Sequence, residues 1–250
     1  MVGSTRDGIA FDGPEGVVTL EDVEVRDIVP EDTDIADGVG YGVSVRMGTL
    51  VMRGGGVWNA SRAGIVAESA ALELTDVTVA DTAPVDGRLG RGIHLQLLSS
   101  ATLTGLSLLG NSDAGFFSSR SGNLVVVDTV IEGTLAATLP DAADTTGDGL
   151  VACQLSEDGT VFDPSTFHAE ITGTIVTGSA RAGIVVDGIE ASLDANTAGA
   201  DNGYSSGGTS IYTQGSASTS GGDRAVPLGD GGDPSLGLNA ESISPDALGE

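Results

Sequence analysis

Residues 72–79 read Leu72-Glu73-Leu74-Thr75-Asp76-Val77-Thr78-Val79 and contain two short alternations of apolar and polar side chains. Alternation with a period of two is typical of a β-strand that buries one face. The two alternations are out of step by one residue around Asp76, so the chain must turn a corner there to keep its apolar side chains on one side. The stretch therefore predicts two short strands joined by a tight corner.

This pattern of four inward positions recurs along the chain. Its other copies are Val18/Leu20/Val23/Val25, Leu50/Met52/Gly55/Val57, Ala101/Leu103/Leu106/Leu108, Leu124/Val126/Thr129/Ile131 and Ala169/Ile171/Thr174/Val176. A glycine followed by an apolar residue opens each repeat, and we call it the opening glycine. The opening glycines are Gly8, Gly42, Gly64, Gly92, Gly115, Gly149 and Gly183. Repeats with the spacing of these glycines indicate a solenoid, in which each repeat buries its apolar face against its neighbours.

The corners of the repeat are occupied by residues that tolerate a positive φ. The first corner has Asp22, Gly54, Asp76, Gly105, Asp128 and Gly173; the second has Asp27, Asn59, Asp81, Gly110, Gly133 and Gly178. Asp, Asn and Gly are the residues that adopt this conformation most readily. Three short strands and two fixed corners per repeat predict an all-β fold, a right-handed parallel β-helix of about seven coils.

We place this β-helix at residues 8–198, followed by a Gly/Ser/Thr-rich linker at 199–222 and an acidic, mostly disordered tail at 223–250. Residues 210–213 are apolar enough to form one more strand. The repeat, with its Gly-Ile opening and Asp/Gly corners, resembles that of the pectin-lyase-like superfamily over residues 8 to 195. The resemblance implies a carbohydrate cleft along the opening strands. It does not imply one activity, because that superfamily includes lyases, hydrolases, epimerases and non-catalytic surface proteins.

The composition limits the partners and the compartment. The chain has 36 acidic residues against ten arginines and no lysine, which gives a net charge of −26. Such a charge repels phosphate backbones and anionic bilayers, so we expect neither nucleic acid nor membrane insertion. Cys153 is the single cysteine, which excludes an internal disulfide. We expect an extracellular or cell-surface location, and we interpret the absence of a signal peptide at Met1 as indicating a fragment of a longer protein.

Candidate site residues follow from the alternation in the opening strands, where the second and fourth residues after the glycine should point outward. This places Arg46 between Asp12 and Glu68 on adjacent coils, with His94 and Gln96 one coil further on. The catalytic candidates are Arg46, Glu68 and His94. The ligand-binding candidates are Asp12, Ser44, Gln96 and Phe117. Carboxylate, guanidinium and imidazole groups on one surface are what a polysaccharide lyase or hydrolase uses.

The same residues also fit a structural interpretation, because opposite charges on adjacent strands stabilise a solvated ladder. The signatures of the superfamily's enzymes are missing: there is no paired-Asp motif, no Gly-His-Gly and no Arg-x-Lys. We therefore predict a non-catalytic, structural or adhesive β-helix segment, with polysaccharide or other surface proteins as partners. The alternative is a polysaccharide lyase or glycoside hydrolase. The oligomeric state is left open.

Calcium is the one cofactor that the sequence suggests. Residues 144–149 resemble the start of an acidic calcium loop, with Asp144 and Asp148 as candidate ligands. The loop's twelfth position is Leu155, where a bidentate Glu is needed, so a solvated acidic turn is the simpler interpretation. Asp32, Asp34 and Asp37 form a similar cluster in the first of four insertions, at 28–41, 82–91, 134–148 and 154–166. We expect these insertions to shape one face of the solenoid.

Overall fold

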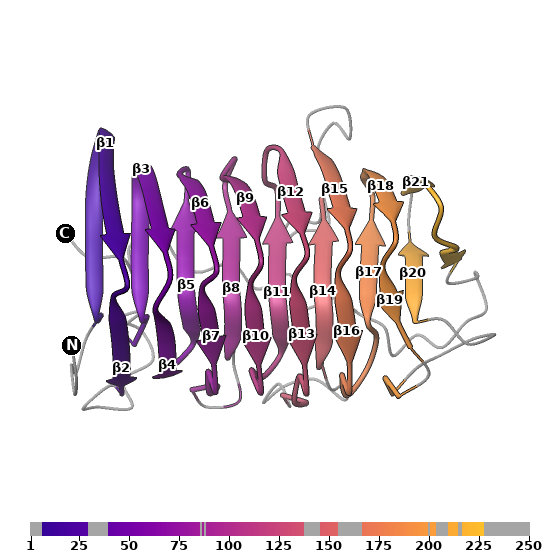
Figure 1. The fold of residues 1–250 in the computed structure, drawn as a ribbon, viewed down its shortest axis with the longest axis horizontal. Coiled ribbons are helices and arrows are strands. Elements are labelled where there is room, and N and C mark those ends of the chain that lie inside the picture. The colour runs from indigo at the N-terminus through magenta and orange to yellow at the C-terminus, as the bar shows by residue number, and fades with distance from the viewer. Residues whose placement is uncertain are drawn as a thin grey trace.

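The computed structural model describes residues 7–29, 40–85, 87, 89–137, 146–154, 167–199, 201–203, 210–214 and 217–227. These residues contain β-strands and no helix, and every strand pairing is parallel. The strands stack side by side along the long axis of the molecule (Figure 1). The described part is therefore all-β, and its arrangement is compatible with the solenoid predicted from the sequence.

The strands fall into three groups that alternate along the chain. Strands β1 (Ile9–Glu21) and β3 (Val43–Arg53) each run through the first two groups. The other opening strands are β5 (Ala63–Glu68), β8 (Arg91–Gln96), β11 (Ala114–Ser119), β14 (Asp148–Cys153), β17 (Ile184–Asp187), β20 (Ile211–Gln214) and β22 (Val226–Pro227). The other second strands are β6 (Ala71–Thr75), β9 (Ser100–Thr104), β12 (Leu124–Val127), β15 (His168–Thr172), β18 (Glu190–Asp194) and β21 (Ser218–Ser220). The third strands are β2 (Glu24–Ile28), β4 (Gly56–Ala60), β7 (Thr78–Ala80), β10 (Ser107–Leu109), β13 (Val130–Glu132), β16 (Ile175–Thr177) and β19 (Thr197–Ala198).

Each strand pairs with its counterpart in the neighbouring repeat. The opening strands follow the order β3-β5-β8-β11-β14-β17-β20-β22, and the third strands follow β2-β4-β7-β10-β13-β16-β19. The predicted extra strand near residue 211 is β20, which pairs in parallel with β17. Strands β20 and β21 lie within the segment expected to be a linker, and β22 lies at the start of the expected tail. Residues 228–250 lie outside the described residues.

The corner prediction is confirmed at all twelve positions, where φ lies between 49° and 66°. In the first corner Asp and Gly alternate from coil to coil, and the reason is steric. A Cβ at Gly105 would lie 2.5 Å from Asp76 Oδ1, and one at Gly173 would lie 2.4 Å from Asp128 Oδ1. The aspartate of one coil therefore occupies the space that a side chain on the next coil would need.

Three asparagines join neighbouring coils at the corners through the same pair of hydrogen bonds. Asn111 Oδ1 accepts from the Thr82 N–H and its Nδ2 donates to the Val79 carbonyl. Asn202 does the same with Ser179 and Val176, and Asn196 with Thr174 and Ile171. Such bonds satisfy backbone groups that leave the strand ladder at a corner.

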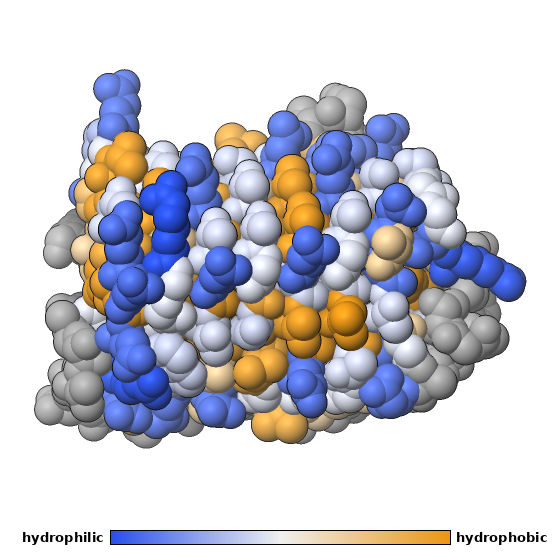
Figure 2. Space-filling view, in the orientation of Figure 1, coloured by the Kyte–Doolittle hydropathy of each residue, from blue (hydrophilic) through white to orange (hydrophobic). Residues whose placement is uncertain are grey.

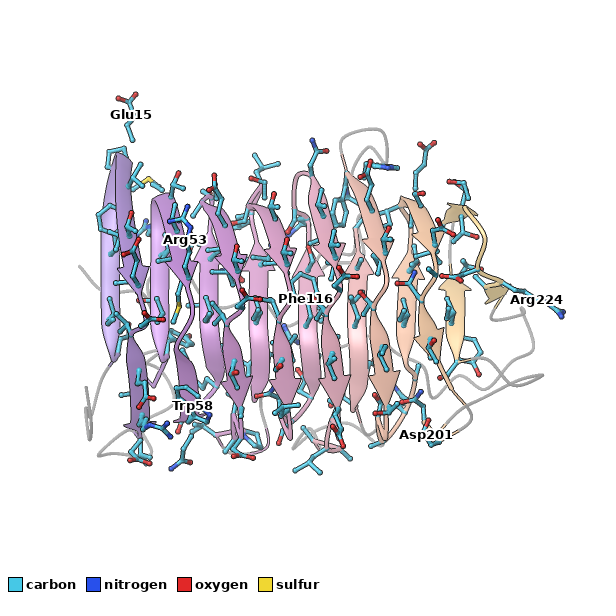
Figure 3. The ribbon with its side chains drawn as sticks, in the orientation of Figure 1. Glu15, Arg53, Trp58, Phe116, Asp201 and Arg224 are labelled. Carbon is cyan, nitrogen blue, oxygen red and sulfur yellow. The ribbon has the colours of Figure 1, made fainter. Side chains whose placement is uncertain are left out.

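The core lies inside the coils and is lined by the predicted inward positions. One buried apolar cluster runs from Val25 to Ile211 and contains side chains from all three strand groups. Phe116 is among its largest members and points between the layers of strands (Figure 3). The face shown in Figure 2 mixes hydrophilic and neutral side chains with several apolar ones. Ile175 and Leu98 are among the exposed large apolar side chains.

Candidate functional site

The candidate residues of the opening strands lie in two columns, as the sequence predicts. Asp12 is in register with Arg46, Arg46 with Glu68, and Glu68 with Gln96. The parallel column contains Ser44, Val66, His94 and Phe117. The spacing of the opening glycines was therefore sufficient to predict which side chains are neighbours.

The expectation that these columns form a solvated ladder is wrong for most of their members. Asp12 and Arg46 reach solvent, with side chains 46% and 30% exposed. Glu68 is 4% exposed, His94 0% and Phe117 3%, and Ser44 and Gln96 are buried as well. A polymeric substrate could contact the first pair of residues, but the described structure gives it no open surface over the others.

The columns are buried because the outward side chains of the opening strands belong to a second apolar layer. Phe117, Val151, Cys153, Val185 and Tyr212 form one cluster, separate from the core inside the coils. Val66 packs with Tyr41, Ala63 and Leu89 in another. We call these side chains, together with the buried polar side chains of the two columns, the outer layer. The sequence holds the signal for it, because Ile184-Val185-Val186 and Leu150-Val151-Ala152-Cys153 do not alternate, as is typical of strands buried on both faces.

Glu68 is the candidate with the most perturbed surroundings among the acidic residues of the two columns. Burial raises the pKa of its carboxyl, and the positive charge of Arg46 opposes that rise. Its Oε2 atom is buried without a hydrogen-bond partner. Arg46 Nη1 is also 3.7 Å from Asp12 Oδ2, so this guanidinium lies between two carboxylates. A carboxyl with a raised pKa is the kind of group that general-acid chemistry uses, although here the group is enclosed.

His94 is completely buried beside an arginine and an aromatic ring. Arg91 Nη1 lies 3.4 Å from Nδ1 and 3.3 Å from Nε2 of the imidazole, and the Phe117 ring is edge-on at 5.3 Å. Burial, and then the charge of Arg91, hold the pKa of His94 well below its usual value of 6.5. The ring is therefore neutral at physiological pH. It is accordingly a packed component of the outer layer rather than a proton carrier in contact with solvent.

Two buried ion pairs at the starts of the opening strands were missed in the sequence analysis. Arg91 Nε donates to Asp113 Oδ2 at 2.5 Å, and the Arg91 guanidinium lies 3.6 Å from the centre of the Phe117 ring. Arg181 Nε donates to Asp148 Oδ1 at 2.9 Å, and its Nη2 contacts Oδ2 of the same carboxylate. A charged residue one or two positions before the opening glycine is the signal that could have revealed them. It occurs at Asp7, Arg62, Arg91, Asp113, Asp148 and Arg181.

The calcium hypothesis is not supported at Asp148. Both oxygens of its buried carboxylate face Arg181, and Oδ1 also accepts from the Ala182 N–H at 3.0 Å. These bonds occupy the atoms that would ligate a cation. Asp144, and the cluster Asp32, Asp34 and Asp37, lie outside the described residues. In the part of the chain that the structure describes, no group of three or more His, Cys, Asp or Glu side chains is placed to hold a metal ion.

The arrangement thus combines a continuous core, a mixed outer layer with neutral His94 and enclosed Glu68, and one solvent-facing pair, Asp12 and Arg46. Among the described residues there is no helix of the length and apolarity needed to cross a membrane. In comparisons with known proteins, no family model, curated protein or solved structure matches this chain.

Proposed function

We propose that this chain is a non-catalytic, extracellular or cell-surface segment that acts as a rigid structural or adhesive rod. In this proposal the fold is a right-handed parallel β-helix of the kind found in the pectin-lyase-like superfamily. It has the seven coils marked by the opening glycines, and the pairing of β20 with β17 supports one coil more. Polysaccharide or other surface proteins are its proposed partners.

The observation that carries the proposal is the burial of the candidate catalytic groups. A hydrolase needs two carboxyl groups on either side of a bound sugar, and a lyase needs a base in contact with it. Glu68 and His94 are enclosed, and the Arg46 guanidinium interacts with the carboxylates of both Asp12 and Glu68. By contrast, the continuous core and the coil-to-coil hydrogen bonds of Asn111, Asn196 and Asn202 are features that make a solenoid stiff.

The proposal is tested by a glycan-array and uronan-cleavage screen of the full chain, with and without millimolar calcium. We expect no release of unsaturated or reducing ends in either condition. Glycan binding without cleavage would identify the adhesive partner. Cleavage that is lost in Glu68→Gln or Arg46→Ala, but kept in the surface control Glu73→Gln, would overturn the proposal.

The alternative, a polysaccharide lyase or hydrolase, is favoured by one observation, the raised pKa of Glu68 next to Arg46. Perturbed carboxyls often mark active sites, although structural charge networks perturb them too. This alternative requires the opening-strand face to become accessible. It therefore predicts that Glu68 reacts with a water-soluble carbodiimide at a rate comparable to that of exposed carboxyls, which peptide mapping would measure.

A further inference from the structure

Apolar side chains gather on the outside of one coil, on its second and third strands. The outward side chains of β12 are Val125 and Val127, and the first outward side chain of β13 is Val130; all three are partly exposed. Ile175 of β16 is in register with Val130 and is 45% exposed. Figure 2 shows apolar surface over β12 and, further along the same coil, over β13 and the adjacent β16. We call these four residues the apolar patch.

The strands of this region do not need apolar side chains at these positions in order to form. The neighbouring coils have polar residues in register with the patch, and their strands pair just as regularly. These residues are Thr102, Thr104 and Ser107 on one side, and Glu170, Thr172 and Thr197 on the other. Threonine, like valine and isoleucine, is a good strand former. Neighbouring exposed apolar side chains inside a polar rim are typical of an interaction surface.

The rim of the apolar patch is negatively charged. Asp128 lies at the corner between β12 and β13, Glu132 ends β13, and Glu170 lies on the adjacent β15; all three are exposed. Strands β9, β10, β12, β13, β15 and β16 carry no arginine, and the chain has no lysine. Their one basic residue is His168, 3.9 Å from Glu170. The surface thus combines an apolar centre with acidic surroundings.

We infer that the apolar patch binds a segment of a partner protein that carries apolar side chains next to lysine or arginine. Burial of Val130 and Ile175 supplies affinity, because it removes apolar surface from water. The carboxylates of Asp128, Glu132 and Glu170 attract cationic side chains and orient the segment. The inference deepens the adhesive role proposed above, on which it rests, by naming the class of partner and the surface that holds it.

The chemistry of the apolar patch disfavours other occupants. A polysaccharide has hydroxyl groups along its length, and some of them would be buried against aliphatic side chains without hydrogen bonds. An anionic bilayer or a nucleic acid would be repelled by the rim. A second copy of this chain would bring two acidic rims together, and like charges facing each other weaken an interface. A cationic, partly apolar protein segment meets neither difficulty.

The chemistry of the partner is tested by calorimetry of the full chain with three synthetic peptides of equal length. The first alternates leucine with lysine, the second has serine in place of leucine, and the third has glutamate in place of lysine. We expect the leucine–lysine peptide to bind at least about tenfold more tightly than either control, because each control lacks one of the two contributions. Equal binding of the serine–lysine peptide would mean that net charge alone attracts it. That result, or no binding of the leucine–lysine peptide, would overturn the inference.

The place of binding is tested by substitutions in the apolar patch. Val130→Thr/Ile175→Thr introduces the residue that the next coil has at Thr197, so the fold should be retained, which circular dichroism and thermal unfolding establish. This variant should bind the leucine–lysine peptide at least about tenfold more weakly. The matched control is Val17→Thr, because Val17 is 64% exposed but lies on β1 at one end of the stack (Figure 1). Equal weakening in the control would contradict the inference.

Methyl NMR of the valine-labelled full chain locates the peptide directly. The methyl signals of Val125, Val127 and Val130 should shift on addition of the leucine–lysine peptide, and those of Val17 should not. Shifts confined to valines outside the patch would overturn the inference.

Sedimentation velocity of the chain alone distinguishes a second copy as the occupant. A dimer that is lost in Val130→Thr/Ile175→Thr would mean that the patch binds another copy, contrary to the inference. Failure at the patch leaves the proposed rod unaffected, since the rod rests on the buried opening-strand groups. Conversely, cleavage in the uronan screen would overturn the non-catalytic rod while leaving the peptide-binding result in place.

Discussion

The inside and the outside of the opening strands are both buried, but their side chains differ in chemistry. On β17, Val186 belongs to the core inside the coils and its neighbour Val185 belongs to the outer layer. The inside is almost entirely apolar. The outside mixes apolar side chains with His94, Glu68 and the ion pair of Arg91 and Asp113. Low exposure therefore marks two different environments in one sheet.

This difference shows that an alternating pattern predicts which side a residue faces but not what covers it. Inside the coils polar side chains are few, because burying them without hydrogen bonds costs free energy. In the outer layer, charged groups such as Arg91 and Asp113 are paired, and burial raises the pKa of Glu68 and lowers that of His94. The outer layer therefore depends on charge pairing as well as on packing.

The largest effect is expected from breaking a buried ion pair at the start of an opening strand. Arg181→Met should lower the free energy of unfolding by about 3–5 kcal/mol, because it leaves the carboxylate of Asp148 buried without its counter-charge. The double variant Arg181→Met/Asp148→Leu should recover much of this loss. Urea unfolding of the single and double variants measures both values. If both variants lose the same free energy of unfolding, the ion pair stabilises the fold through packing rather than through charge.

A matched pair of substitutions on β17 compares the two layers directly. Val186→Ala and Val185→Ala remove the same two methyl groups from opposite faces of one strand, and each side chain is at most 1% exposed. If the outer layer is packed as tightly as the core, each substitution should cost about 2 kcal/mol. Urea unfolding decides this. A loss for Val185→Ala below about 0.5 kcal/mol would mean that the outer face is open in solution, as is typical of surface substitutions.

Two serines on opening strands should respond with opposite signs. Ser118 lies at an inward position and its buried hydroxyl has no hydrogen-bond partner, whereas Ser44 Oγ donates to Asp7 Oδ2 at 3.0 Å. Ser118→Ala should therefore raise the free energy of unfolding by about 1 kcal/mol, and Ser44→Ala should lower it by about 1.5 kcal/mol. Thermal unfolding gives the sign of each change. Destabilisation by Ser118→Ala would indicate that this hydroxyl has a partner in solution.

Much of the fold could be predicted from the sequence because it depends on local chemistry. Corner positions such as Asp76 and Gly105 need a residue that accepts a positive φ, and that requirement is visible in any single repeat. The register of Asp12, Arg46 and Glu68 follows from counting residues after each opening glycine. Both features are repeated in coil after coil, so the sequence carries several independent copies of the same information.

The candidate site was predicted less well because its environment depends on contacts between distant residues. The solvated ladder expected at Glu68 was wrong, because its carboxyl is buried. The pairing of Arg181 with Asp148 joins residues 33 positions apart, whereas the local sequence around Asp148 indicated only a solvated acidic turn or a calcium ligand. A non-alternating run such as Ile184-Val185-Val186 was the available signal for a doubly buried strand.

The two titratable candidates of the outer layer should affect stability in opposite directions as the pH changes. The pKa of Glu68 is raised on folding, so the folded state keeps a proton that the unfolded state releases, and stability is lost as the pH rises from about 4.5 through the folded pKa. The pKa of His94 is lowered on folding. Its contribution is therefore present above pH 6.5 and is lost as the pH falls toward the folded pKa, because only the unfolded chain takes up the proton.

The smallest expected effect is therefore a pH-dependent difference in the free energy of unfolding between each variant and the wild type. It is measured by urea unfolding of the wild type, Glu68→Gln and His94→Gln at pH 7, 5.5 and 4. The stability of Glu68→Gln relative to the wild type should be greatest at pH 7 and should shrink as the pH falls to 4, where the native carboxyl is also protonated. As the pH falls from 7 to 4, His94→Gln should become more stable relative to the wild type, because its unfolded state has no imidazole to protonate. Using differences between variants cancels the titration of the other carboxylates. A wild type and His94→Gln that respond identically to pH would mean that His94 is accessible to protons in the folded state, and the outer layer would then be a solvent-facing surface.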